Sequence, residues 1–196
     1  MHEKTGDIRI SGIISALILS LLLWGLPCPL SAAASSPGSS EDGRVSLLED
    51  REYFPAFLKA IHNANDEVVM SFFLFKTNGY NKSYSDRVLA GLVQAAKRGV
   101  RVKIVLEKSS RARDSLANKS NRETAERLVG KGIDVRFDSP HVTTHVKVAV
   151  VDKRYVFLGS HNLTNSALKY NHELSVFIDS PSMAMETLKY INSLHK

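Results

Sequence analysis

Residues 145–162 read His-Val-Lys-Val-Ala-Val-Val-Asp-Lys-Arg-Tyr-Val-Phe-Leu-Gly-Ser-His-Asn. Their alternating apolar pattern predicts two strands, over 145–151 and 155–158, joined by a short turn. His145 and Lys147 are two residues apart on the first strand, so their side chains are expected on one side, while the intervening valines face the core. One polar and one apolar face is typical of a strand at the edge of a sheet.

Polar residues gather where the second strand ends. Gly159 allows a close backbone approach, and Ser160 and Asn162 bring a hydroxyl and an amide to the same rim as His145 and Lys147. An ammonium, a hydroxyl and an amide suit the oxygens of a phosphodiester, and a neutral imidazole can attack its phosphorus. The acidic residues are scattered along the chain, so we expect neither a metal ion nor another cofactor at this site.

The spacing H-x-K-x(4)-D-x(6)-G-S-x-N is met without a gap and closely resembles the HKD signature of the phospholipase D superfamily. The resemblance covers roughly residues 45–196 and implies a phospholipase D-like fold. It also implies that His145 is the nucleophile and forms a phosphohistidine. Lys147, Ser160 and Asn162 would then bind the phosphate.

Three further positions take roles from the same resemblance. Glu173, in the segment Asn-His-Glu, is similar to the glutamate of the family and is expected to hydrogen-bond a catalytic imidazole and fix its tautomer. With His145 and Lys147 it completes the catalytic set. Asp152 and Gly159 are expected to support the site without touching the phosphate.

The number of motifs predicts an assembly. Enzymes of this family use two such histidines: one attacks, while the other protonates the leaving oxygen and then activates water. This chain carries one copy of the motif and resembles the small nuclease branch, in which two subunits share one active site. We therefore expect a two-fold homodimer.

The rest of the chain alternates between strand and helix patterns. Strands are predicted over 45–48, 68–75, 100–106, 133–137 and 173–178, and helices over 53–64, 86–99, 124–129 and 181–194. Asp86 is expected to cap the second of these helices. This alternation predicts an α/β fold with a mixed, largely parallel sheet flanked by helices.

The first residues are typical of an export signal. Two basic residues precede the apolar run 10–26, and small residues end at Ala34, which predicts a signal peptide over 1–34 and a periplasmic or secreted protein. The alternative is an uncleaved membrane anchor at 10–26. Residues 35–43 are predicted to be a linker, and 44–196 the phosphodiesterase domain. Removal of 1–34 would remove Cys28, the one cysteine, and with it disulfide and thiolate chemistry.

The net charge of +6 favours anionic partners such as nucleic acid or acidic lipid. A predicted exposed loop over 108–122 carries Lys108, Arg111, Arg113, Lys119 and Arg122, with Arg101 and Lys103 nearby. This set predicts either a rim for a phosphate backbone or a solvated surface. The loop has no aromatic residue, which favours backbone contacts with little sequence specificity.

Four functions compete on these observations. The first is a metal-independent, nonspecific endonuclease for DNA, RNA or both, and the second is a membrane-associated phospholipase D-type lipid phosphodiesterase. A non-catalytic nucleic-acid-binding module would not need His145, and a restriction-type nuclease would need a recognition domain that the sequence does not show. His141, His161 and His172 are interpreted as bystanders, with His161 at the lining of the cleft.

Overall fold

The computed structural model describes residues 43–79, 83–110 and 115–194. The segment 1–34 predicted as a signal or anchor, and all but Gly43 of the predicted linker, lie outside the described residues. Among the described helices, none has the length and apolar character that crossing a membrane requires.

Seven strands form one sheet in the order β1-β7-β6-β5-β2-β3-β4. The strands are β1 (Arg44–Glu49), β2 (Glu67–Phe72), β3 (Arg101–Leu106), β4 (Asp134–Phe137), β5 (Lys147–Val151), β6 (Tyr155–Gly159) and β7 (Leu174–Asp179). The expected mixed α/β fold is confirmed, but most neighbouring strands are antiparallel, and only β2, β3 and β4 run parallel. The reason is connectivity: helices link the three parallel strands, whereas a tight turn links β5 to β6.

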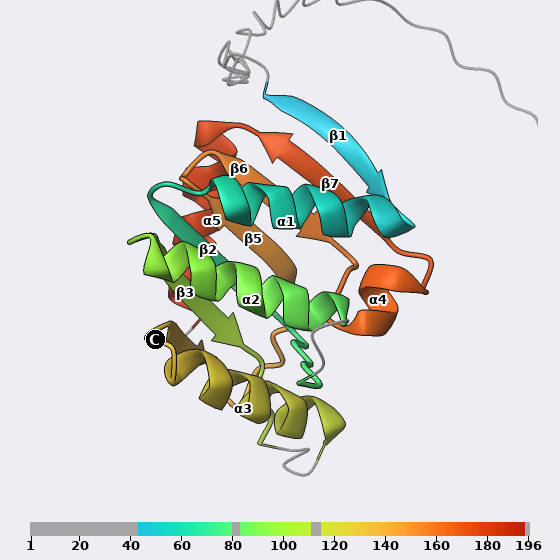
Figure 1. The fold of residues 1–196 in the computed structure, drawn as a ribbon, viewed down its shortest axis with the longest axis vertical. Coiled ribbons are helices and arrows are strands. Elements are labelled where there is room, and N and C mark those ends of the chain that lie inside the picture. Colours follow the sequence, from blue (N-terminus) through green and yellow to red (C-terminus); the bar gives the residue numbers. More distant parts are fainter. Residues whose placement is uncertain (1–42, 80–82, 111–114, 195–196) are drawn as a thin grey trace, which may run out of the picture. The chain divides into compact units, whose positions relative to one another are not determined.

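Helices cover both faces of the sheet (Figure 1). They are α1 (Tyr53–Asn63), α2 (Tyr84–Lys97), α3 (Leu116–Val129), α4 (Asn165–Lys169) and α5 (Pro181–Ser193), with a 3-10 turn η1 at Asp50–Glu52. The larger apolar core lies between the sheet and α1, α2 and α3, while α5 packs on the opposite face over Val69, Val150 and Val156. The domain is therefore a three-layer α/β/α sandwich.

Two predicted boundaries are wrong for a shared reason, since polar side chains that suggested loops are buried partners of the backbone. Helix α3 begins at Leu116 instead of Thr124, so half of the predicted basic loop is helical. Its buried Asn121 donates to the carbonyls of Phe73 and Glu107 and accepts from Phe75 N at 2.9 Å. Helix α2 begins at Tyr84, and Asp86 does not cap it.

Candidate active site

His145 and Lys147 lie where the chain enters β5, the middle strand of the sheet. Although one polar and one apolar face is typical of an edge strand, β5 pairs with both β2 and β6, and every residue from Lys147 to Val151 is buried. The valines at 148 and 150 face the α5 side, as expected, and Ala149 and Val151 face the other core.

The structure brings the imidazole of His145 and the ammonium of Lys147 together. Lys147 Nζ lies 3.2 Å from His145 Nδ1 and 3.3 Å from Nε2, and it donates to the His145 carbonyl at 2.8 Å. The Lys147 side chain is enclosed, with 7% of the residue exposed, whereas His145 is open to solvent. Burial lowers the pKa of the Lys147 ammonium, and the charge of Glu173 opposes that effect.

Phe73 packs against both His145 and Lys147, and this contact was not predicted from the sequence. Its ring centroid is 4.6 Å from that of His145 and 5.2 Å from Lys147 Nζ. The Phe73 N–H also donates to the Val146 carbonyl at 2.9 Å. This residue follows β2 directly, so the antiparallel pairing of β2 with β5 delivers it to the histidine.

Ser160, near the end of the motif, contacts Glu173. Ser160 Oγ donates to Glu173 Oε2 and accepts from Leu174 N at 3.0 Å, and Asn171 Nδ2 donates to Glu173 Oε1 at 3.0 Å. Both carboxylate oxygens of Glu173 therefore have partners other than an imidazole among the described residues. A cavity of about 480 Å³ opens beside Ser160 and Glu173.

Asn162 has an unused polar atom. Its Oδ1 is buried, and among the described residues no hydrogen-bond partner reaches it. The amide can also turn so that its nitrogen takes this place. A buried polar group left unpaired costs free energy, so this amide is suited to a bound ligand.

The two supporting residues make structural contacts. The carboxylate of Asp152, in the turn between β5 and β6, accepts from the N–H groups of Asn65, Asp66 and Glu67 at 3.0, 2.8 and 3.1 Å. A Cβ on Gly159 would lie 2.2 Å from Ser175 Oγ, so β6 and β7 leave no room for a side chain there.

His161 does not line a cleft, and this prediction is wrong. The residue is fully buried, and its ring stacks on Tyr53 with centroids 4.4 Å apart. Its Nδ1 lies 2.7 Å from Ser175 Oγ, and its Nε2 lies 2.8 Å from the Asp50 carbonyl. His161 is thus a core residue with both ring nitrogens satisfied, which places it among the bystanders.

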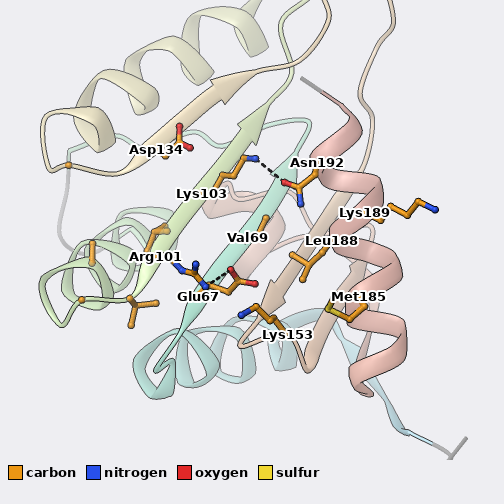
Figure 2. Close-up of a pocket in the computed structure, with 15 residues that line it drawn as sticks. Glu67, Val69, Arg101, Lys103, Asp134, Lys153, Met185, Leu188, Lys189 and Asn192 are labelled. Carbon is orange, nitrogen blue, oxygen red and sulfur yellow. Dashed lines mark hydrogen bonds and ion pairs between the residues drawn. The ribbon is translucent and has the colours of Figure 1, made fainter. Parts of the chain in front are cut away.

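The basic residues divide between the two ends of β3. Lys108 follows the carboxyl end, while Arg101 is at the amino end and pairs with Asp66 and Glu67. A separate groove of about 760 Å³ lies between β3 and α5. Figure 2 shows Arg101 and Lys103 along it, and Lys103 Nζ donates to Asn192. These two residues therefore do not join Lys108 in one rim. Lys119 and Arg122 are exposed on α3, and Arg111 and Arg113 lie outside the described residues.

In the part of the chain that the structure describes, no three His, Cys, Asp or Glu side chains gather as a metal site would require. The ammonium of Lys147 brings positive charge next to His145.

Comparisons with known proteins agree with the motif. A family model described as "Cardiolipin synthase, PLD-like domain" matches residues 57–195. A phospholipase D of Rickettsia typhi is 33% identical over 114 residues, which are 55% of this chain and 52% of that protein. Cardiolipin synthase B of Escherichia coli is 27% identical over 136 residues, which are 62% of this chain and 30% of that protein. The chain thus spans about half or less of the length of these relatives.

Solved structures share the fold. Nuc of Salmonella typhimurium, a phospholipase D family member, is 28% identical with a TM-score of 0.64, and the match covers 78% of this chain and 94% of Nuc. NucT of Helicobacter pylori is 18% identical with a TM-score of 0.60, covering 78% of this chain and 96% of NucT. At that identity NucT supports the fold alone.

Proposed function

Since the chain belongs to the phospholipase D superfamily of phosphodiesterases, we propose that it is a metal-independent endonuclease that hydrolyses DNA, RNA or both through a phosphohistidine at His145. The observation that carries the proposal is the placement of the Lys147 ammonium 3.2 Å from an exposed His145 ring, at the middle of the sheet. A neutral imidazole held beside a buried cation is suited to attack an anionic diester.

The proposed reaction has two steps. The His145 imidazole attacks phosphorus, a P–N bond forms, and the P–O bond to the leaving alcohol breaks as a second histidine donates a proton to that oxygen. The second histidine then takes a proton from water, which attacks phosphorus and releases His145. Lys147, Ser160 and Asn162 hold the non-bridging oxygens, where negative charge increases in both transition states. When the Ser160 hydroxyl turns from Glu173 to the phosphate, the Glu173 carboxylate accepts a hydrogen bond from a catalytic imidazole.

The second histidine comes from a second copy of the chain. On the α5 side of the sheet, α5 packs over Val156 of β6 and Ile178 of β7, and the neighbouring part of β1, β6 and β7 is an apolar face that stays exposed. Leu47, Leu158 and Leu174 are 59%, 45% and 54% exposed on it. Leu47 and Leu158 both pair with Val176, and Leu174 follows Glu173, so this face is continuous with the site. Burying it between two copies would bring two His145 residues to one substrate.

Several observations favour nucleic acid as the substrate. The net charge is +6, and Lys108, Lys119 and Arg122 are exposed beside the carboxyl end of β3 and along α3. Nuc matches over nearly its whole length, whereas the cardiolipin synthase matches over less than a third. We further propose export to the periplasm or the medium after removal of residues 1–34.

The second candidate is a lipid phosphodiesterase held at a membrane by residues 10–26. It is favoured by the description of the matching family model and by the relatives named phospholipase D and cardiolipin synthase B. The two candidates share the chemistry of His145 and differ in the alcohol groups that the diester joins.

The test uses the full chain with excess EDTA on plasmid DNA, on DNA and RNA oligonucleotides, and on phosphatidylglycerol and cardiolipin vesicles. His145→Ala is the inactive variant, and His141→Ala, a change at another exposed histidine, is the matched control. We expect the parent and His141→Ala to cleave nucleic acid and His145→Ala to leave it intact. Lipid turnover with intact nucleic acid would replace the nuclease by the second candidate, and cleavage that EDTA abolishes would contradict metal independence.

A further inference from the structure

Two buried carboxyl groups lie behind the nucleophile, and the proposed reaction does not use them. Glu107 directly follows β3 and Asp138 directly follows β4, the neighbouring parallel strand. Glu107 is 2% exposed and Asp138 is 6% exposed. Two acidic side chains enclosed this deeply require compensation from protons or hydrogen-bond donors.

The donors are only partly supplied by the backbone. Thr144 N donates to Glu107 Oε2 at 2.6 Å, and Lys108 N donates to Asp138 Oδ1 at 2.8 Å. Asp138 Oδ2 is buried and, among the described residues, accepts no hydrogen bond from an assigned donor. A proton on Glu107 would supply the missing donor, since Glu107 and Asp138 directly follow the paired residues Leu106 and Phe137, and Asp138 acts on the Glu107 carboxyl group.

We propose that Glu107 and Asp138 share one proton and act as positioning residues, which hold His145 in its attacking geometry through the peptide N–H of Thr144. The proposal rests on the role of His145 in the proposed function. It assigns no contact with the substrate to either carboxyl group.

The connection to His145 is one peptide long on each side. The Thr144 N–H is fixed by Glu107 at the end of β3, and the Val146 carbonyl is fixed by Phe73 N at the end of β2. His145 is therefore held between two anchors on neighbouring strands, and its ring rests against Phe73. Loss of the Glu107 anchor would free one side of the residue that must attack in line.

The Glu107–Asp138 pair is expected to lose its proton at a pH at which enzymes work. Burial and the neighbouring Asp138 raise the pKa of Glu107 to about 7, against the opposing effect of the Thr144 N–H. Neighbouring groups contact the backbone of Glu107 or an aromatic ring. Lys108 turns its ammonium over the Phe137 ring, α3 contributes the neutral amide of Asn121 to the Glu107 carbonyl, and β2 contributes the Phe72 carbonyl. Above pH 7 Glu107 loses this proton and its carboxylate is repelled by Asp138, which moves the acceptor of the Thr144 N–H and with it the neighbouring His145.

The test compares Glu107→Gln, Glu107→Ala and Asp138→Asn with the parent, and Glu126→Gln, an exposed change on α3, is the matched control. Glutamine keeps an acceptor for Thr144 and supplies a permanent donor to Asp138, so it imitates the protonated pair. We expect its kcat on bis(p-nitrophenyl) phosphate to match that of the parent at pH 6 and not to fall above pH 7 as the parent's does. Glu107→Ala should lower kcat about 100-fold with little change in KM, the effect of misplacing a reacting group.

The second measurement needs no substrate. The amide resonance of Thr144 in the full chain should shift with a midpoint near pH 7 in the parent, move to lower pH in Asp138→Asn, and stay constant in Glu107→Gln. A Thr144 resonance that does not titrate in the parent, or titrates equally in Glu107→Gln, would overturn the proposal. So would a full kcat in Glu107→Ala when His145→Ala is inactive. If the parent cleaves no diester, the proposed function fails, and the Thr144 resonance still decides whether the carboxyl pair shares a proton.

Discussion

At the scale of single residues, position 161 shows that the variable position within the motif serves stability. His161 is enclosed between Tyr53, Ser175 and the carbonyl of Asp50. Burial lowers its pKa, so the folded protein holds the neutral ring at pH values where the unfolded chain binds a proton.

The lowered pKa predicts that the loss of stability on replacing His161 depends on pH. At pH 7 the ring is neutral in both states, and His161→Gln should lower the free energy of unfolding because it removes the stacking on Tyr53. As the pH falls through 6.5 toward the lowered folded pKa, the parent loses stability and the variant does not, so the difference between them narrows. Urea unfolding at pH 7 and pH 5 measures it, and a difference that widens on acidification would contradict the assignment.

Sequence spacing predicted some of the site residues better than others. His145 and Lys147 meet because two residues on a strand share a face, which the sequence alone dictates. Phe73 reaches His145, and Glu107 reaches the neighbouring Thr144, only because the strand ends that carry them are neighbours in the sheet. Their signal in the sequence, a polar or aromatic residue just after a buried strand, is shared by many residues without such a role.

At the scale of elements, the close approach of β6 to β7 sets the place of Ser160. Gly159 faces Ser175 with no space for a Cβ, and the next residue uses its hydroxyl to join Glu173 and Leu174. The strand pair therefore depends on the absence of a side chain at position 159.

Gly159→Ala should lower the stability by about 1–3 kcal/mol through overpacking, and it should also lower activity because Ser160 moves with the strand. Gly130→Ala is the control, since a Cβ there comes no closer than 3.3 Å to another atom and the backbone is helical. Thermal unfolding and diester turnover of both variants check this prediction. Equal stability of the two variants would show that β6 and β7 separate at little cost.

Elements with clear periodicity were predicted close to their observed bounds, and α1 and α5 are examples. Periodicity does not reveal strand direction, which follows from whether a helix or a turn links two strands. The prediction that the sheet is largely parallel was therefore wrong. The start of α3 was missed because Asn118 and Asn121 resemble loop residues until their partners at the strand ends are known.

At the scale of the whole molecule, the proposed chemistry takes one nucleophile, His145, from each chain and needs a second histidine. The exposed leucines at 47, 158 and 174 occupy the face that continues from Ser160 and Glu173. A homodimer would bury this apolar surface and complete the site in the same event.

Leu47→Lys should prevent this assembly. Each interface would contain two copies of the change, and each leucine contributes about 1.5–3 kcal/mol when buried. The variant is expected to sediment as a monomer and to lose diester hydrolysis while remaining folded. Val129→Lys, at a similarly exposed residue near the end of α3, is expected to stay dimeric and active. A fully active monomer of Leu47→Lys would contradict the shared site.

The most direct measurement of the central claim is a rapid quench in base of the full chain mixed with a radiolabelled oligonucleotide, followed by peptide mapping. We expect an acid-labile, base-stable phosphoryl adduct on the peptide that contains His145, present in the parent and absent in His145→Ala. An adduct on Ser160, or turnover that leaves no adduct on any histidine, would contradict the role of His145 as nucleophile.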